Sequence, residues 1–167
     1  MKKVRRINNE GFSLVELIIV IAIMAILAAA LAPQLIKYID SSRKSTDVST
    51  GQSIATAVGV ALANEAAYSD AVSRITASDP AIYWVSECDS SGDEFEKKVG
   101  EIIGTTPPKP KYRGTGTNDF DDFAIVISKD ATNNVSFAIY PATKNASGYT
   151  VVDADMVYPT VGLNYAD

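Results

Sequence analysis

One carboxylate stands near the start of a long apolar run. Glu16 is followed, from Leu17 to Ala32, by sixteen residues without a polar side chain. An acidic residue at the centre of a bilayer-spanning helix costs about 2.5–3.5 kcal/mol on insertion scales, so it needs a cationic partner. A cut between Gly11 and Phe12 would free an amine four residues before Glu16. The predicted chemistry is therefore ion pairing of Glu16 with the amine of Phe12, in the same chain or in a neighbouring copy.

The segment that carries Glu16 is long enough to cross a membrane. Residues 12–32 are 21 residues, and as a helix they span about 31 Å, which matches the hydrocarbon core of a bilayer at about 30 Å. The segment before the apolar run is basic, with Lys2, Lys3, Arg5 and Arg6 opposed only by Glu10. Under the positive-inside bias this predicts a cytoplasmic leader and an exported remainder.

This pattern resembles the type IV pilins and the type II secretion pseudopilins. A short basic leader ends in Gly11, Phe12 follows, Glu16 is the fifth residue after the cut, and the apolar run leads to Pro33. The close resemblance covers about residues 2–38. It implies that a prepilin peptidase cuts after Gly11 and methylates the amine of Phe12. It also implies that Glu16 pairs with the terminal amine of an adjacent copy as an assembly platform and motor move the subunit from the membrane into a fibre.

The resemblance divides the chain into three segments. Residues 1–11 are expected to be a leader removed on processing, and residues 12–33 the transmembrane and filament-core helix. Residues 34–167 are expected to form the globular head, including the second half of the long helix. The small residues of the apolar run would let such helices approach closely in a fibre; they are Ala22, Ala25, Ala28, Ala29, Ala30 and Ala32.

The helix is expected to continue past Pro33. A proline inside a helix removes one hydrogen bond and clashes with the preceding turn, so Pro33 predicts a kink. Apolar residues resume after it at helical spacing, with a gap near Ser41 to Ser45, which predicts a helix as far as about Asn64. A helix of this length is more than a head of this size needs for itself, so its apolar half must be covered by lipid or by other copies.

The remaining sequence predicts a small α+β head. Asp93 or Ser91 can cap a helix over residues 94–103, which Gly104 would end. Segments 123–128, 135–140 and 149–152 carry β-branched and aromatic residues between turn clusters. We therefore predict a pilin-like fold, in which a long amino-terminal helix packs against a small antiparallel sheet.

Composition excludes several classes of site. The chain has no histidine and one cysteine, Cys88, which removes Ser-His-Asp sets, Cys-His sets and histidine zinc sites, and no intrachain disulfide can form. Cys88 is predicted to be a small buried side chain. No enzyme activity, cofactor or metal is expected. The acidic loop residues are predicted to be solvated rather than to bind calcium; they are Asp119, Asp121, Asp122, Asp153 and Asp155. Residues 12–167 carry 11 basic and 19 acidic side chains, so nucleic acid is a poor partner.

The predicted function is that of a structural subunit, the abundant one, of a type IV pilus that supports motility, adhesion or aggregation. The precursor would cross the cytoplasmic membrane once, and the mature subunit would lie in an extracellular fibre with other copies of itself. A type II secretion pseudopilin is the alternative with the same amino terminus. A secreted or anchored binding protein is the third reading, because basic residues, an apolar stretch and Ala28-Ala29-Ala30 also fit a conventional signal peptide.

Overall fold

The protein is described by a computed structural model covering residues 11–76, 79–113, 120–145, 148–149 and 153–166. The chain divides into two compact units, Met1–Ile39 and Asp40–Asp167. The first unit contains the beginning of one long helix, and the second is the head.

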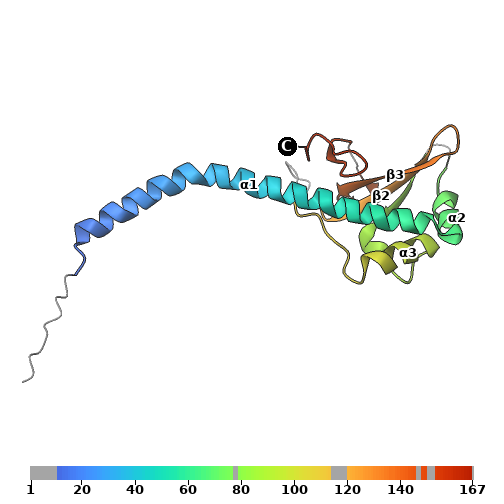
Figure 1. Cartoon of the computed structure of the whole chain (residues 1–167), viewed down its shortest axis with the longest axis horizontal. Coiled ribbons are helices and arrows are strands. Elements are labelled where there is room, and N and C mark those ends of the chain that lie inside the picture. The colour runs from blue at the N-terminus through green and yellow to red at the C-terminus, as the bar shows by residue number, and fades with distance from the viewer. Residues whose placement is uncertain (1–10, 77–78, 114–119, 146–147, 150–152, 167) are drawn as a thin grey trace, which may run out of the picture. The chain divides into compact units, whose positions relative to one another are not determined.

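The long helix, α1, runs from Leu14 to Leu62 and contains Pro33 without ending there (Figure 1). The prediction of a helix that continues past Pro33 to about Asn64 is confirmed. The kink at Pro33 stays a prediction. In the first unit the large apolar side chains of α1 are exposed to solvent, and none of the described ones is buried.

The part of α1 inside the head has one buried face. Ile54, Ala57, Val58 and Ala61 follow the three-to-four-residue spacing of one helix face and lie in the main core. Gly51 lies on the same side, and a Cβ atom there would meet the side chain of Val157. The close contact between α1 and the carboxyl-terminal segment therefore depends on this glycine.

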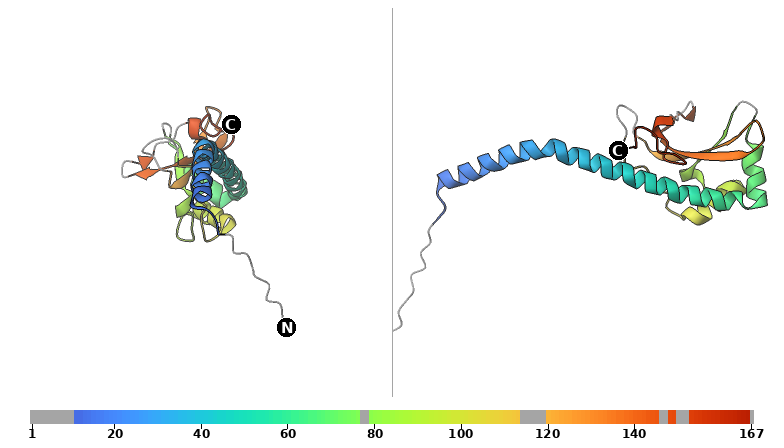
Figure 2. Two further views of the ribbon diagram at one scale, coloured as in Figure 1. Left: turned by 90° about the vertical axis from the view of Figure 1, so that its left-hand side faces the viewer. Right: turned by 45° about the horizontal axis from the view of Figure 1, so that its top comes forward.

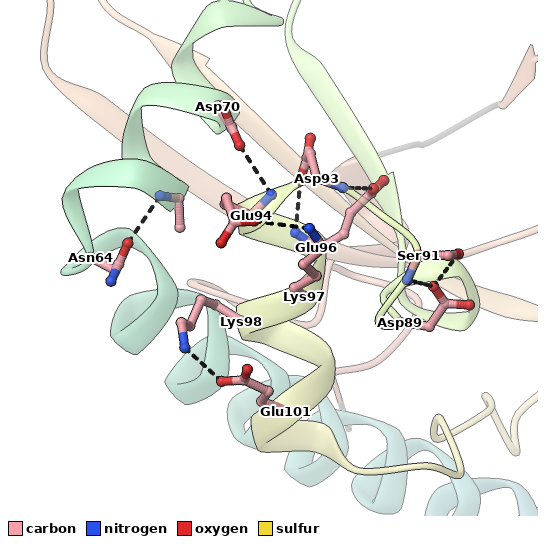
Figure 3. Close-up of polar contacts among 11 residues, drawn as sticks. Asn64, Asp70, Asp89, Ser91, Asp93, Glu94, Glu96, Lys97, Lys98 and Glu101 are labelled. Atoms are coloured by element: carbon pink, nitrogen blue, oxygen red, sulfur yellow. Dashed lines mark hydrogen bonds and ion pairs between the residues drawn. The ribbon is translucent and has the colours of Figure 1, made fainter.

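Two short helices follow. Helix α2 (Glu65–Ser73) begins at Asn64, whose side chain accepts the N–H groups of Ala66 and Ala67. Helix α3 (Glu94–Ile103) begins at a capping box in which Asp93 accepts the N–H of Glu96, and the Glu96 side chain accepts the N–H of Asp93 (Figure 3). The prediction of α3, with its Asp93 cap and its end at Gly104, is confirmed. Helix α2 was not predicted.

The main sheet has three antiparallel strands in the order β1-β2-β3: β1 (Ala81–Trp84), β2 (Asp122–Lys129) and β3 (Val135–Ala142). Its buried residues alternate between two faces, as the period of a strand requires. Phe123, Ile125 and Ile127 share the main core with α1, while Ala124 packs with Trp84 on the other face. The predicted antiparallel sheet against the long helix is therefore confirmed, and β1 was missed.

A separate pair is formed by β4 (Lys144–Asn145) and β5 (Gly148–Tyr149), with a short 3-10 turn over Val85–Glu87 and another over Asp153–Asp155. The predicted strand at 149–152 lies mostly outside the described residues. The carboxyl-terminal segment joins the edge of β3, where Ile139 N–H donates to Tyr158 O at 3.0 Å and Val157 N–H donates to Ile139 O at 2.9 Å.

Within the head, β2 and β3 lie along one side of α1, and α3 lies on another (Figures 1 and 2). One core joins the helix, the sheet and the carboxyl-terminal segment. The α+β architecture predicted from the sequence is the one observed.

Candidate functional site

The residues around the predicted cut precede the helix. Gly11, Phe12 and Ser13 are exposed and not helical, and α1 begins at Leu14. The peptide bond between Gly11 and Phe12 is thus outside the hydrogen-bonded helix and open to a peptidase. A Cβ atom added at Gly11 would meet no other atom, since nothing lies within 4 Å of it.

Ser13 and Glu16 cap the start of α1. The Ser13 N–H donates to Glu16 Oε2 at 2.9 Å, and the Val15 N–H donates to Ser13 Oγ at 3.3 Å. These bonds satisfy backbone N–H groups that have no partner within the helix. The Ser-x-x-Glu spacing is typical of such a cap, which was not predicted. In the uncut chain the Glu16 carboxylate therefore has a neutral backbone partner.

The segment that follows offers Glu16 no cation. From Gly11 to Ile36, Glu16 is the only ionisable residue. Among the described residues, α1 is the one helix that is long and apolar enough to cross a membrane. No residue in the most apolar stretch of α1 is buried. No described residue of this chain covers the apolar side chains of this segment.

The small residues of this segment are also uncovered. Ala22, Ala25, Ala29 and Ala32 are exposed, at intervals of three or four residues that place them on neighbouring parts of one helix face. Such residues allow two helices to approach closely. The segment is therefore suited to pack against copies of itself as well as against lipid.

A buried carboxylate on α1 holds two other segments of the head against the helix. Asp47, on α1, is fully buried; its Oδ1 accepts the Lys111 N–H at 2.7 Å and its Oδ2 accepts the Tyr112 N–H at 2.8 Å. The Tyr165 hydroxyl also donates to Oδ2, at 3.4 Å. Burial raises the pKa of Asp47, although these hydrogen bonds oppose the shift. The carboxylate ties the loop after α3 and the carboxyl-terminal segment to α1.

The second buried carboxylate corrects a prediction. Asp122 was expected to be a solvated loop acid, but it is buried at the first residue of β2. It accepts the N–H and the hydroxyl of Ser86 and the N–H of Phe123. Burial raises its pKa. Asp121 is exposed and Asp155 partly exposed. Asp119 and the side chain of Asp153 lie outside the described part of the chain.

Cys88 lies beside a pocket of about 540 Å³ that Ser86, Lys97 and Glu101 also line. As predicted, the thiol is buried; it donates to the carbonyl oxygen of Trp84 at 3.4 Å. Burial raises the pKa of Cys88 to about 12, so the thiol stays neutral and is a poor nucleophile. Within the described ranges, no three His, Cys, Asp or Glu side chains come close enough together to hold a metal ion.

Comparison with known proteins adds one finding. Residues 6–32 match the family model described as the prokaryotic N-terminal methylation motif. No curated protein and no solved structure matches the chain. The matched segment is the class III leader of type IV pilins and pseudopilins, as the sequence predicted. The chain thus carries, at its amino terminus, the leader motif found in precursors of type IV pilins and pseudopilins.

Proposed function

We propose that the protein is the abundant structural subunit of a type IV pilus. The observation that supports this most directly is an apolar helix half that no described residue of its own chain covers, within and after a methylation motif. A membrane covers such a helix in the precursor, and other copies cover it in a fibre. The mature protein begins at Phe12, and the residues from 12 onward supply both the fibre core and the head.

Glu16 drives assembly in this proposal. Its charge is unfavourable in lipid until a cation reaches it, by at most the value of about 2.5–3.5 kcal/mol that applies at the centre of a spanning helix. The terminal amine that cleavage frees at Phe12 is such a cation, and in a fibre the amine of one copy lies against the Glu16 of another. Pairing the two charges favours the fibre over the membrane.

The first experiment measures the intact mass of protein sheared from cell surfaces and sequences its amino-terminal peptide. A chain that begins at methylated Phe12 supports the proposal. A chain that begins near Leu31 would mean that a signal peptidase had removed Glu16 with the apolar run, and the fibre mechanism would be wrong.

The second experiment tests Glu16 with a matched control. Glu16→Gln removes the charge, and Ser13→Ala removes the hydroxyl contact of the same cap but leaves the charge in place. We expect Glu16→Gln chains to be cut but to stay in the membrane fraction, while Ser13→Ala chains enter fibres. Equal incorporation of both variants would contradict the role of the charge.

A pseudopilin would pass both of these experiments. Electron microscopy of cells that express the protein at its native level separates the two readings. We expect long surface fibres that the protein's antibody labels along their length. Labelled fibres that appear only on overexpression, together with a secretion defect in a deletion strain, would favour the pseudopilin.

A further inference from the structure

Charge is unevenly distributed along the head. Five basic residues lie in segments 40–47 and 107–113; they are Arg43, Lys44, Lys109, Lys111 and Arg113, here called the basic collar. These two segments contain two acids, Asp40 and the buried Asp47. Burial raises the pKa of Tyr112, and the charges of Asp40 and Asp155 add to this shift. Asp155 is therefore a further acid near these segments. The collar therefore retains an excess of positive charge.

The two segments of the collar are held together. Asp47 accepts the N–H groups of Lys111 and Tyr112, which fixes the loop on α1. The Lys44 ammonium lies 5.1 Å from the centre of the Tyr112 ring. Three prolines, at 107, 108 and 110, restrict the backbone of the same loop. The side chains of Lys109 and Lys111 are exposed on this fixed backbone.

A second region of the head is acidic. Residues 64–103 contain nine acidic and three basic side chains, and we call this region the acidic end. Some of these acids form ion pairs. The Arg74 guanidinium lies 3.0 Å from the Asp93 carboxylate and 3.5 Å from that of Glu96. The excess of acids remains after these pairs. Glu65 and Glu94 are exposed, at the first turns of α2 and α3.

The part of the acidic end that begins α2, with Glu65, lies far from Lys44 of the basic collar. Lys44 and Leu62 are separated by 18 residues of α1, or about 27 Å, and α2 follows beyond Leu62. Figures 1 and 2 show α2 at the far end of the head and the chain after α3 returning along α1. Glu65 of one molecule therefore cannot reach Lys44 of the same molecule.

We propose that the basic collar of each subunit docks on the acidic end of a second copy in the fibre. This inference rests on the proposed function. Identical subunits that lie parallel and are displaced along a fibre axis bring unlike parts of their surfaces together, and such head-to-tail contacts build open helical assemblies. Opposite charges favour this register, and like charges disfavour copies that meet collar to collar.

The test is a charge exchange in the full-length protein, assayed as fibre yield from cell surfaces. Lys109→Glu with Lys111→Glu reverses the collar, and Glu65→Lys with Glu94→Lys reverses the acidic end. Each pair alone is expected to lower fibre yield about tenfold or more, because it places like charges at the contact. The chain with all four changes is expected to regain much of the yield, since the contact is again complementary.

A control variant separates this contact from a general effect of charge. Lys129→Glu reverses an exposed lysine at the end of β2, outside both regions, and should keep the wild-type yield. Cell extracts are probed for Cys88 alkylation to confirm that each variant is folded. Wild-type yield from either reversed pair, or no recovery in the fourfold variant, would overturn the proposal. If the wild-type protein forms no fibre, the proposed function itself fails.

Discussion

Replacement of Asp47 by asparagine tests how the head holds its loops. Both carboxylate oxygens of Asp47 accept backbone N–H groups, from Lys111 and Tyr112. An amide has one acceptor oxygen, so Asp47→Asn turns an NH2 group toward one of these N–H donors. That donor is then buried without an acceptor, and the loop is expected to loosen from α1.

The magnitude follows from the lost acceptor. A buried N–H left without a partner costs about 1–3 kcal/mol. The long contact from Tyr165, at 3.4 Å, adds little. The variant also removes a carboxyl whose charged form is disfavoured by burial, which offsets part of the loss. We therefore expect Asp47→Asn to lower the free energy of unfolding by about 1–2 kcal/mol.

The effect should depend on pH in a defined direction. Burial raises the pKa of Asp47 above 3.8, so the folded chain holds this proton more tightly than the unfolded chain. The Asp47 contribution to stability is therefore largest below 3.8 and decreases as pH rises through the raised pKa. The asparagine side chain does not titrate. The difference in the free energy of unfolding between wild type and variant should be largest at low pH and should decrease as pH rises.

The assay is urea unfolding of the full-length protein in detergent micelles, followed by the fluorescence of Trp84, the only tryptophan, which is buried on β1. Asp40→Asn is the control, because Asp40 forms an exposed ion pair with Arg43 at 3.6 Å. Such pairs are worth about 0–1 kcal/mol. An Asp47→Asn midpoint equal to wild type, or a difference that widens as pH rises, refutes the reasoning.

Three further predictions use the same unfolding measurement or a simple labelling reaction. Gly100→Ala should destabilise the head by about 1–3 kcal/mol, because its Cβ would overlap the backbone carbonyl of Cys88. Gly59→Ala, on α1 with no atom near the added Cβ, should instead stabilise by about 0.5–1 kcal/mol through helix propensity. Cys88, buried and with its pKa raised to about 12, should resist iodoacetamide at pH 8 until urea unfolds the head; rapid labelling of the native protein would contradict its placement.

The elements that could be predicted are those with strong local signals. Helix α3 has a cap at Asp93, a buried pair at Phe95 and Val99 on one face, and an end at Gly104 with φ 92°. Strands β2 and β3 are rich in β-branched and aromatic residues on either side of a turn. For these segments, local preference and tertiary packing agree, which is the condition under which sequence patterns suffice.

The elements that were missed have weak local signals. Helix α2 is rich in alanine and short, and only its Asn64 cap distinguishes it from a loop. Strand β1 has four residues and exists through its pairing with β2. The burial of Asp47 and Asp122 likewise depends on distant N–H and hydroxyl donors, which no pattern around either residue contains. These features arise from long-range contacts.

In the proposed assembly mechanism the Glu16 carboxylate exchanges one partner for another. The free energies of the two contacts indicate which partner it prefers. In the uncut chain the carboxylate accepts the Ser13 N–H, a contact of the kind worth about 0.5–2 kcal/mol. This contact leaves the charge uncompensated, and in lipid an uncompensated charge costs up to about 2.5–3.5 kcal/mol, the value for the centre of a spanning helix. A cationic amine compensates the charge, which a neutral backbone N–H does not. Glu16 is therefore expected to leave Ser13 once cleavage frees Phe12, and to do so without any rearrangement of the head, whose core residues all lie beyond residue 40.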